Sequence, residues 1–238
     1  MATLRRVVPW LVFLGLAGTL ALSRPWQYLP AQWNPWEPLA IDHPITPVSK
    51  WKLRGLQHEP EQCLPILATA PPGVIDHVPL QDYTPVAGCP LTNVVRINRT
   101  GVAFSSRFTV TCPLAVAWVM FEQQALQPLA HRHFGSQLQR VEHFGSFACR
   151  NIYHREDDRR SQHASANAFD VAGFRLADGT RITVLRDWDN PAAPKKSAFL
   201  NEAHSAACQY FGTVLGPNYN QPHENHFHFD GSGFGFCR

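Results

Sequence analysis

Hydrophobic residues recur at helical spacing in two parts of the chain. In the first part, apolar residues lie three or four positions apart: Leu114, Trp118, Phe121 and Ala125. Pro113 suits the first turn of a helix, and Thr111 suits the capping position before it. The pattern predicts a core helix that Pro128 breaks or restarts, because proline has no backbone N–H.

The second part lies nearer the C-terminus. Its apolar residues at helical spacing are Phe199, Ala203, Ala207, Phe211 and Val214. Gly216 and Pro217 follow them, and this pair is typical of a helix end. We therefore predict an amphipathic helix over residues 199–214.

Apolar residues also alternate with other residues between Phe169 and Leu185, and the turn-forming pair Asp178-Gly179 divides that stretch. This pattern predicts a β-hairpin, with Asp170 at the start of its first strand. A further strand is expected over His223–His228, after an Asn-rich loop. Together these elements predict an α+β domain in which helices pack on one side of an antiparallel sheet.

The N-terminal region begins with Arg5-Arg6 and continues with an apolar run over residues 7–22. Such a region is typical of a signal peptide or a signal anchor. Ala21-Leu-Ser23 resembles a cleavage site, but Arg24-Pro25 directly after it is unfavourable for cleavage. The run is also shorter than the about 20 residues that usually cross a bilayer.

We favour an uncleaved anchor, because Trp26 and Tyr28 suit the membrane interface after the apolar run. The arginines before the run place the N-terminus in the cytoplasm. The rest of the chain is then expected in the periplasm, tethered to the inner membrane by residues 7–22.

Residues 24–50 are rich in proline and tryptophan and show no sustained periodicity. We interpret them as an extended tether. Its tryptophans are expected near the membrane interface or packed on the domain: Trp26, Trp33 and Trp36. The predicted organisation is a leader over residues 1–23, a tether over 24–50 and one domain over 51–238.

Composition narrows the function classes. The chain has 238 residues, of which 45% are hydrophobic and 16% are charged, so a domain of ordinary size has a sufficient core. The formal net charge of +3 is mild, and no dense Lys/Arg tract indicates a nucleic-acid partner. A slightly basic surface suits an anionic cell wall.

Six cysteines agree with export: Cys63, Cys89, Cys112, Cys149, Cys208 and Cys237. Their even number, wide spacing and lack of a Cys-x-x-Cys motif predict three disulfides rather than a thiolate zinc site. About fifteen pairings are possible and stay open. Free cysteines in the core are the alternative.

Candidate chemistry lies in the segment His223-Glu-Asn-His226-Phe-His228. In an extended strand His226 and His228 project from one face, and Phe227 and Phe229 from the other. Neighbouring imidazoles on one face suit a metal ligand beside a proton carrier. Taken alone, the motif is more often a satisfied or exposed pair of histidines.

A second segment, Ser161 to Asp170, contains His163. On a straight helix His163 and Asp170 would lie about 10 Å apart along the axis, and on a straight strand they would face opposite sides. If both bind one metal, His163 must lie in a loop before a strand that begins near Ala168. The polar run over residues 155–160 is typical of such a loop.

The candidate ligands are His163, Asp170 and His228. Three N/O ligands with a vacant fourth position are what a catalytic zinc site needs, whereas structural zinc sites are normally closed. His226 is left to act on the water that zinc would bind.

The pattern Ser161-x-His163-x-x-Ala-x-Ala168-x-Asp170 with His226-x-His228 resembles the zinc motif of D-Ala-D-Ala metallocarboxypeptidases and murein endopeptidases, a superfamily that includes the Hedgehog signalling domain. From about Trp51 to Arg238 the chain also resembles the bacterial extensin-like C-terminal domain. The segments that carry this second likeness are Phe147–Arg150, Ser161–His163, Ala172–Phe174, Asp187-Trp188, Leu215–Asn220 and Cys237-Arg238. The chain has no Ser-Pro dipeptide, so the repeats of a plant extensin are not expected.

The resemblance implies three zinc ligands, a general base, a further active-site histidine and an arginine that stabilises the oxyanion. The implied zinc ligands are His163, Asp170 and His228. His226 is the implied general base, His223 is the further histidine, and Arg150 is the arginine. The peptidase motif usually has glycine where this chain has Ala166. The backbone beside the metal is therefore expected to differ. The alternative role for Arg150 is a surface or structural salt bridge.

These assignments imply an exported zinc hydrolase that acts on the peptides of peptidoglycan, with neutral His226 as the proton acceptor. Glu224 and His223 are candidates to hydrogen-bond the ligands, and an exposed salt-bridging role is the alternative for Glu224. Asp187-Trp188 is a candidate groove lining, although core packing of Trp188 is favoured. The alternatives are a zinc-stabilised module that binds peptidoglycan or a polysaccharide without cutting it, and a metal-free structural domain.

Overall fold

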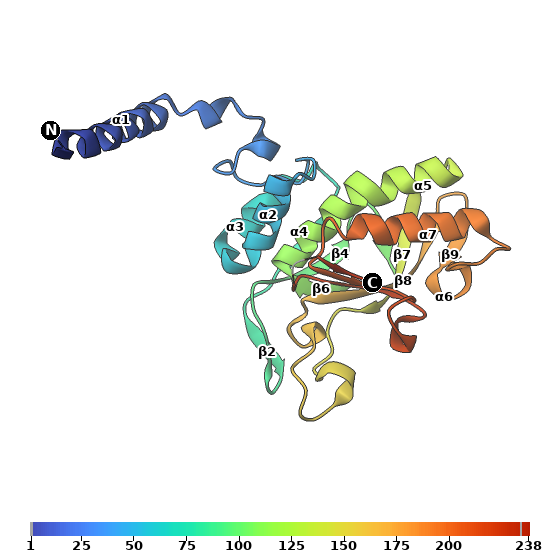
Figure 1. The fold of residues 1–238 in the computed structure, drawn as a ribbon. Helices are drawn as coiled ribbons and strands as arrows, with labels where there is room; N and C mark the ends of the chain where they lie inside the picture. The colour runs from blue at the N-terminus through green and yellow to red at the C-terminus, as the bar shows by residue number, and fades with distance from the viewer. Residues whose placement is uncertain (1, 234) are drawn as a thin grey trace.

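The computed structural model describes the backbone of residues 2–233 and 235–238, and the side chains of these residues except 2–7, 11, 17, 20, 21 and 154. It shows an α+β protein with antiparallel sheets, helices and three disulfides (Figure 1). The predicted α+β class, with helices, antiparallel strand pairing and disulfides, is therefore confirmed.

Within the described residues, the largest sheet has the strand order β12-β10-β11-β8-β7-β5, with β9 also paired to β8. Its strands are β5 (Ala103–Phe104), β7 (Leu138–Gly145), β8 (Ala168–Leu176), β9 (Arg181–Thr183), β10 (Thr213–Leu215), β11 (Phe227–Asp230) and β12 (Phe236–Cys237). The pairs β5–β7 and β10–β12 are parallel, and the other pairs are antiparallel.

Two smaller sheets lie before this one in the chain. One is the antiparallel sheet β1-β4-β6, and the other is the β2–β3 hairpin. Their strands are β1 (Asp76–Pro79), β2 (Tyr83–Val86), β3 (Cys89–Leu91), β4 (Val94–Arg99) and β6 (Phe108–Thr111).

Three helices lie over one face of the large sheet (Figure 1). They are α4 (Cys112–Phe121), α5 (Gln127–Phe134) and α7 (Pro194–Ala207). A π-helical turn, Glu122–Leu126, joins α4 to α5. Helix α5 begins at Gln127 with Pro128 in its first turn, which agrees with the predicted restart. Every residue of α4 is buried, so the predicted apolar stripe belongs to a helix buried on all sides.

The capping role predicted for Thr111 is wrong in one respect. Thr111 does occupy the N-cap position of α4, but its side chain makes no capping hydrogen bond. Instead its Oγ1 donates to Asn167 Oδ1 at 2.9 Å. A tertiary partner has replaced the local one.

The helix predicted over residues 199–214 is too long. α7 ends at Ala207, and Val214 lies in β10, although Phe211 and Val214 are buried as expected. The chain turns at Gly212, where a side chain would collide with the carbonyl group of Ser232. The helical spacing therefore reflects burial from a loop and a strand.

The predicted hairpin is confirmed, because β8 and β9 pair antiparallel and Gly179 adopts φ 88° in the turn. Val184 begins the short helix α6 (Val184–Asp187) instead of ending the strand. The strand predicted from His223 is shorter than expected. It begins at Phe227, and His223 lies in a 3-10 turn, Gln221–His223, beside Pro222.

Helix α1 (Ala2–Ser23) precedes 3-10 turns at Pro25–Tyr28 and Ala31–Trp33. Within the described part of the chain, no helix is both long and apolar enough to cross a bilayer. Positions 7, 11, 17, 20 and 21 of the predicted anchor lie outside the described side chains. The anchor therefore stays a prediction.

The predicted extended tether needs correction at its C-terminal end. Leu39 and Ile41 lie in the main core, and the boundary expected at residue 51 falls inside α2 (Pro47–Gly55). A capping box formed by Thr46 and Ser49 starts this helix. The 3-10 turn Leu56–His58 and α3 (Pro60–Leu67) follow, so the packed region begins near Leu39.

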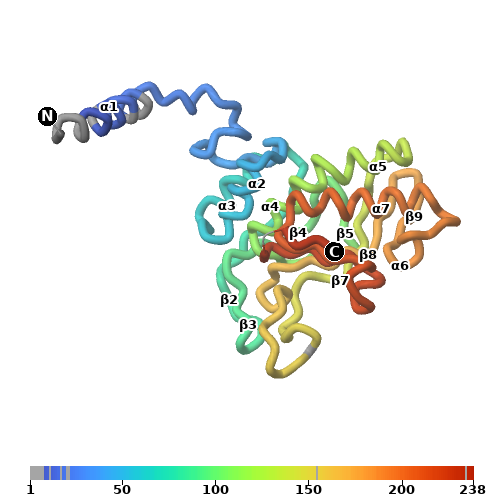
Figure 2. The backbone as a smooth tube through the Cα atoms, viewed as in Figure 1, coloured from blue at the N-terminus to red at the C-terminus, as the bar shows by residue number. Residues whose placement is uncertain are grey.

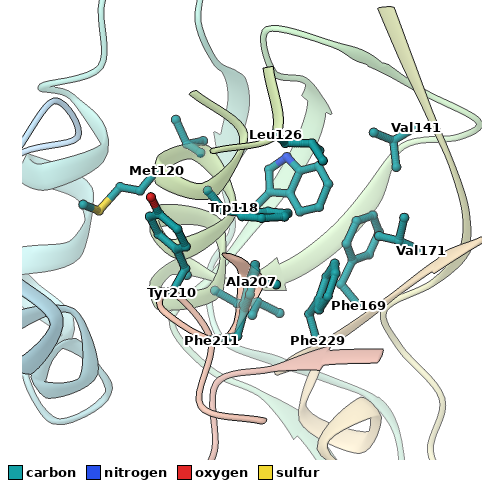
Figure 3. Packing of buried hydrophobic residues seen from close by; sticks show 14 of the residues in the cluster. Trp118, Met120, Leu126, Val141, Phe169, Val171, Ala207, Tyr210, Phe211 and Phe229 are labelled. Atoms are coloured by element: carbon teal, nitrogen blue, oxygen red, sulfur yellow. The ribbon is translucent and has the colours of Figure 1, made fainter. Parts of the chain in front are cut away.

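The main core fills the space between the large sheet and its helices (Figure 3). Phe169 and Val171 of β8 and Phe229 of β11 face Trp118 of α4 (Figure 3). Phe229 stacks on Phe211 with ring centroids 4.7 Å apart. Alternate residues of β8 and β11 thus build the core, as the period of a strand requires.

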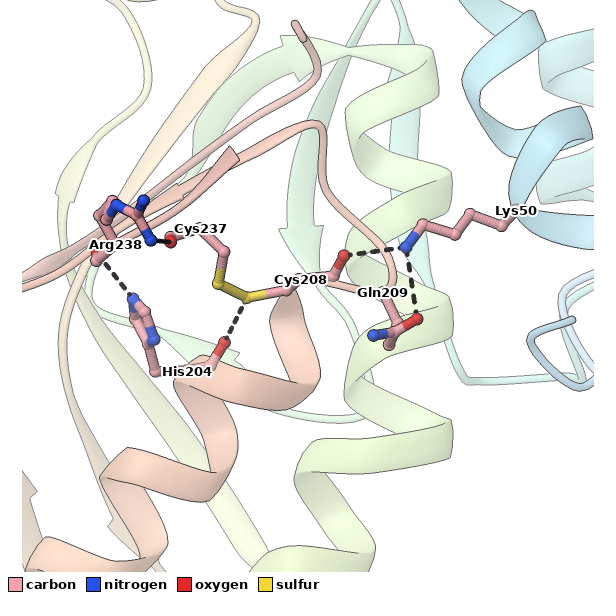
Figure 4. Close-up of a disulfide and its surroundings, with 6 residues drawn as sticks. All are labelled: Lys50, His204, Cys208, Gln209, Cys237 and Arg238. Atoms are coloured by element: carbon pink, nitrogen blue, oxygen red, sulfur yellow. Dashed lines mark hydrogen bonds between the residues drawn. A yellow bond between two sulfur atoms is a disulfide. The ribbon is translucent and has the colours of Figure 1, made fainter. Parts of the chain in front are cut away.

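All six cysteines are paired, so the prediction of three disulfides is confirmed. The pairs are Cys63–Cys112, Cys89–Cys149 and Cys208–Cys237. The last pair joins the end of α7 to β12, and Lys50 of α2 donates to the Cys208 carbonyl group nearby (Figure 4). The C-terminal segment thus lies beside β10 within the domain (Figure 2).

Candidate functional site

The face of the large sheet opposite the helices carries the candidate ligands. Asp170 of β8 and His228 of β11 are direct partners in the antiparallel register, so their side chains share one face. His163 lies in a 3-10 turn, Gln162–Ser165, just before β8 begins at Ala168. The loop position inferred for His163 is therefore confirmed.

The three side chains converge on one point. His163 Nε2 lies 3.2 Å from Asp170 Oδ2 and 3.2 Å from His228 Nδ1. His228 Nδ1 lies 2.9 Å from Asp170 Oδ1. One ligand atom from each residue therefore lies within 4.8 Å of the other two, which makes a shared metal ion geometrically possible.

Outward hydrogen bonds orient both imidazoles. His163 Nδ1 donates to the Ser146 carbonyl oxygen at 3.1 Å, and His228 Nε2 donates to Asp230 Oδ2 at 3.0 Å. Asp230 is held in turn by the backbone N–H and hydroxyl of Ser232. We assign the outward nitrogens as donors from these partners, so His163 Nε2 and His228 Nδ1 are the atoms that would bind a metal ion once they carry no proton.

The inward atoms of these three side chains surround one position for a cation, which is a proton in the absence of a metal ion. Burial raises the pKa of Asp170, but hydrogen bonds from His163 and His228 outweigh it and hold that pKa well below its usual range. Burial lowers the pKa of His228, but the carboxylates of Asp170 and Asp230 outweigh it and raise that pKa to about 9. Two imidazoles and a carboxylate are ligand types that suit a divalent metal ion, which would displace the His228 proton on binding.

His226 lies directly before β11, with Nε2 3.6 Å from Asp170 Oδ1. Its Nδ1 donates to Asn225 Oδ1 at 2.7 Å, which leaves Nε2 as an acceptor. Burial lowers the pKa of His226, and the Asp170 carboxylate opposes this shift only in part. A neutral imidazole therefore stands beside the three candidate ligands near pH 7.

His223 is the neighbour of His226, with ring centroids 5.2 Å apart. Its Nδ1 donates to Asn220 Oδ1 at 2.5 Å. Burial, followed by the charges of His226 and His228, lowers the pKa of His223 to about 4. This histidine is therefore also neutral near pH 7.

A cavity of about 860 Å³ opens over the converging side chains. Arg150, His223 and His226 line it together with the three candidate ligands. Among the described residues, no carboxylate lies within 4 Å of the Arg150 guanidinium. The structure thus brings all six predicted site residues to one cavity, and it shows no salt bridge for Arg150 in the described part of the chain.

A family model for the C-terminus of extensin-like proteins matches residues 61–238, which is more than half of the chain. The chain belongs to the extensin-like C-terminal family. No curated protein and no solved structure matches it.

The matched extensin-like region contains every predicted site residue. Ala166, which stands where the peptidase motif usually has glycine, also lies in this region. Ala166 adopts φ 54° and ψ 25°, the left-handed conformation that glycine favours. The expectation that the backbone beside the metal differs from that of the peptidases stays a prediction.

Several residues of the extensin-like site were missed by the sequence. Asp230 holds His228, and it continues the alternation of His226 and His228 along one face, a signal that was available. Ser146 acts through its backbone carbonyl group, which no sequence signal marks. Exposed Phe144 lies against His226, with ring centroids 5.6 Å apart.

Two other candidates lie away from the ligands. Glu224 is exposed, and Asp230 fills the supporting role proposed for it. Trp188 packs against Phe227 and does not line the cavity, so its predicted core position is confirmed. Asp187 is also buried and accepts a hydrogen bond from Thr183 N.

A second cluster of metal-ligand types in the described part of the chain comprises His204, Cys208 and Cys237. Its two sulfur atoms are joined in a disulfide, and His204 Nε2 donates to the Arg238 carbonyl oxygen (Figure 4). Disulfide sulfurs are not thiolates, so this cluster is structural.

Proposed function

We propose that this extensin-like protein is a zinc-dependent hydrolase that cuts peptides of cell-wall peptidoglycan, in the manner of the D-Ala-D-Ala peptidases. The observation that carries the proposal is the convergence of His163, Asp170 and His228 beneath an open cavity, with His226 Nε2 3.6 Å from Asp170. The superfamily relationship rests on the same motif. Three disulfides support an exported, periplasmic protein.

The residues present suit zinc. Two imidazole nitrogens and one carboxylate are common zinc ligands, and both rings have a hydrogen-bonded outer nitrogen. A fourth position would face the cavity. When bound there, zinc would supply a Lewis acid that activates water and polarises a carbonyl group.

The other side chains of the cavity take the remaining roles. Neutral His226 accepts a proton at Nε2, because its Nδ1 is occupied by Asn225. Arg150 stabilises negative charge that develops on the substrate carbonyl oxygen. His223, held by Asn220, lies beside His226 and is placed to hydrogen-bond the substrate.

A second candidate function is a zinc-stabilised module that binds the wall polymer without cutting it. Aromatic residues around the cavity favour it, since Tyr153, Tyr219 and Phe236 line the opening. Such rings make contact area that a binding module needs. A binding module has no use for a neutral imidazole beside the ligands, which is why we prefer the hydrolase.

The test compares wild type with His226→Ala at matched zinc content, using release of soluble peptides from purified peptidoglycan. Loss of a placed proton acceptor should lower turnover by about 10²- to 10⁴-fold, while zinc stays bound. Replacement of the exposed His58, which lies outside the cavity, is the matched control and should change nothing. Arg150→Ala should also slow turnover, by about 10²-fold or more.

Two outcomes would contradict the proposal. If wild type sediments with the polymer but releases nothing across several wall chemistries, the binding module replaces the hydrolase. If elemental analysis finds no zinc in protein purified without chelator, and added zinc leaves stability unchanged, the metal site itself is wrong.

A further inference from the structure

The cavity carries more positive charge than the proposed chemistry uses. Arg159 and Arg160 line it together with Arg150. Arg150 is assigned above to the carbonyl oxygen at the bond that is cut. Arg159 and Arg160 are exposed, so their guanidinium groups are available to a ligand in the cavity.

All three arginines lie on one two-stranded ribbon of residues 150–161, whose strands pair over 150–152 and 159–161. Arg150 O accepts a hydrogen bond from Ser161 N at 3.1 Å, and Asn151 forms an antiparallel bridge with Arg160. Ile152 N donates to Arg159 O at 3.0 Å. The ribbon continues directly into the turn that holds His163, so backbone pairing fixes the arginines relative to the candidate ligands.

The ribbon is tied down at both ends. The disulfide Cys89–Cys149 anchors its base to β3. Near its tip, Tyr153 Oη accepts a hydrogen bond from Asn220 Nδ2 at 2.8 Å, and Asn220 also holds His223. The arginines are therefore presented by a braced segment that bridges to the loop bearing His223, which lowers the entropy lost on binding.

Nothing in the described part of the chain neutralises these guanidinium groups by direct contact. No carboxylate lies within 4 Å of Arg159 or Arg160. The carboxylates that line the cavity, Asp170 and Asp230, already accept hydrogen bonds from His228. The acidic residues 156–158 at the ribbon tip do not line the cavity. The acidic residues 156–158 and the basic residues Arg159 and Arg160 are neighbours in the sequence, but only the basic ones line the cavity.

We propose that Arg159 and Arg160 bind a carboxylate of the substrate, so that the proposed hydrolase takes an acidic peptide with a free carboxylate close to the bond it cuts. The guanidinium fork matches the two oxygens of a carboxylate, and such charge-assisted pairs are strong. The inference rests on the proposed function for the cutting step. Binding of the carboxylate does not need turnover.

The test is equilibrium binding to the full chain, with and without zinc. The probes are a fluorescent acidic peptide with free carboxylates and the same peptide with those carboxylates amidated. Wild type should bind the acidic peptide roughly 10- to 100-fold more tightly. The double variant Arg159→Gln, Arg160→Gln should lose this preference and should bind the amidated peptide as before.

The matched control is Arg155→Gln, from the same ribbon. The Arg155 guanidinium lies 5.5 Å from the centre of the Tyr153 ring and does not line the cavity, so the preference should persist in this variant. Far-ultraviolet circular dichroism of each variant establishes that the chain is folded.

Equal affinity of wild type for the two peptides overturns the inference. Persistence of the preference in the Arg159→Gln, Arg160→Gln variant also overturns it, because the carboxylate would then be bound elsewhere. Tight, carboxylate-dependent binding without cleavage supports the inference but contradicts the proposed hydrolase. Failure of the inference can therefore be told apart from failure of the proposed function.

Discussion

The two faces of the large sheet use the same strands for opposite purposes. On the covered face, Phe169 and Phe229 pack against helices, and both side chains are buried in the core. On the open face, Asp170 and His228 belong to the same two strands and meet beneath a cavity. A shift of one residue along a strand therefore separates a group that stabilises the fold from one that carries the candidate chemistry.

Two buried carboxylates show how far the faces differ. Glu122, at the start of the π-helical turn on the covered side, has its pKa raised to about 7 by burial, and hydrogen bonds from Thr100, Trp118 and Gln123 oppose the rise only in part. Asp170 on the open side has its pKa lowered, because two imidazoles outweigh its burial. The carboxyl group in the core is therefore more easily protonated than usual, whereas the one in the site is more easily ionised.

The largest expected change in the free energy of unfolding comes from removing a core side chain on the covered face of the sheet. Phe229→Ala removes a fully buried ring and should lower the free energy of unfolding by about 3–5 kcal/mol. Phe144→Ala is the matched change near His226 on the open side, where the ring is 62% exposed, and it should cost less than about 1 kcal/mol. Chemical denaturation of both variants measures the contrast, and equal losses would contradict the division between the faces.

The next effect is a pH dependence from Glu122. Its pKa rises from 4.5 in the unfolded chain to about 7 in the folded one, so between these values only the folded state keeps the proton. The contribution of Glu122 to the free energy of unfolding is therefore fully present below pH 4.5 and is lost as the pH rises to about 7. The total loss is about 3 kcal/mol.

Glu122→Gln should flatten the decline in unfolding free energy between pH 4.5 and about 7, because an amide does not titrate. The exposed Glu61→Gln serves as the control and should leave the decline in place. Denaturant titrations at several pH values measure both. An unchanged pH profile in Glu122→Gln would show that other groups cause the decline.

A smaller effect is expected where the open face supports its ligands. Asp230→Asn removes the negative charge that faces His228 Nε2 and should weaken zinc binding by about 10- to 100-fold. Asp178→Asn, in the turn between β8 and β9, is the control and should not alter zinc affinity. Competition with a chromogenic chelator measures the affinity, and an unchanged value for Asp230→Asn would remove its supporting role.

The smallest effect concerns the backbone beside the site. Ala166 already holds a left-handed conformation, so Ala166→Gly should change unfolding free energy by less than about 1 kcal/mol, because relief of strain offsets the added freedom of the unfolded chain. Ala164→Gly, in the 3-10 turn, has no such strain to relieve and should destabilise by about 1 kcal/mol. Thermal melts compare the two, and a larger loss for Ala166→Gly would be contrary to this account.

The sequence by itself determined much of the local structure. Period-two alternation predicted that His228 and Phe229 face opposite sides, and the odd spacing of His163 and Asp170 required a loop before β8. The even number of cysteines, six, predicted three disulfides. The motif also singled out the six residues that meet in the cavity.

Only the tertiary structure decided the rest, because contacts between distant segments override local pattern. Phe211 and Val214 continue a helical spacing, yet the helix ends at Ala207 and the chain turns at Gly212, which lies close to Ser232. The pairing of cysteines depends on which segments fold together, as with Cys89 and Cys149. Likewise Arg159, Arg160 and the backbone of Ser146 reach the site through folding, and spacing along the chain carries no record of such long-range neighbours.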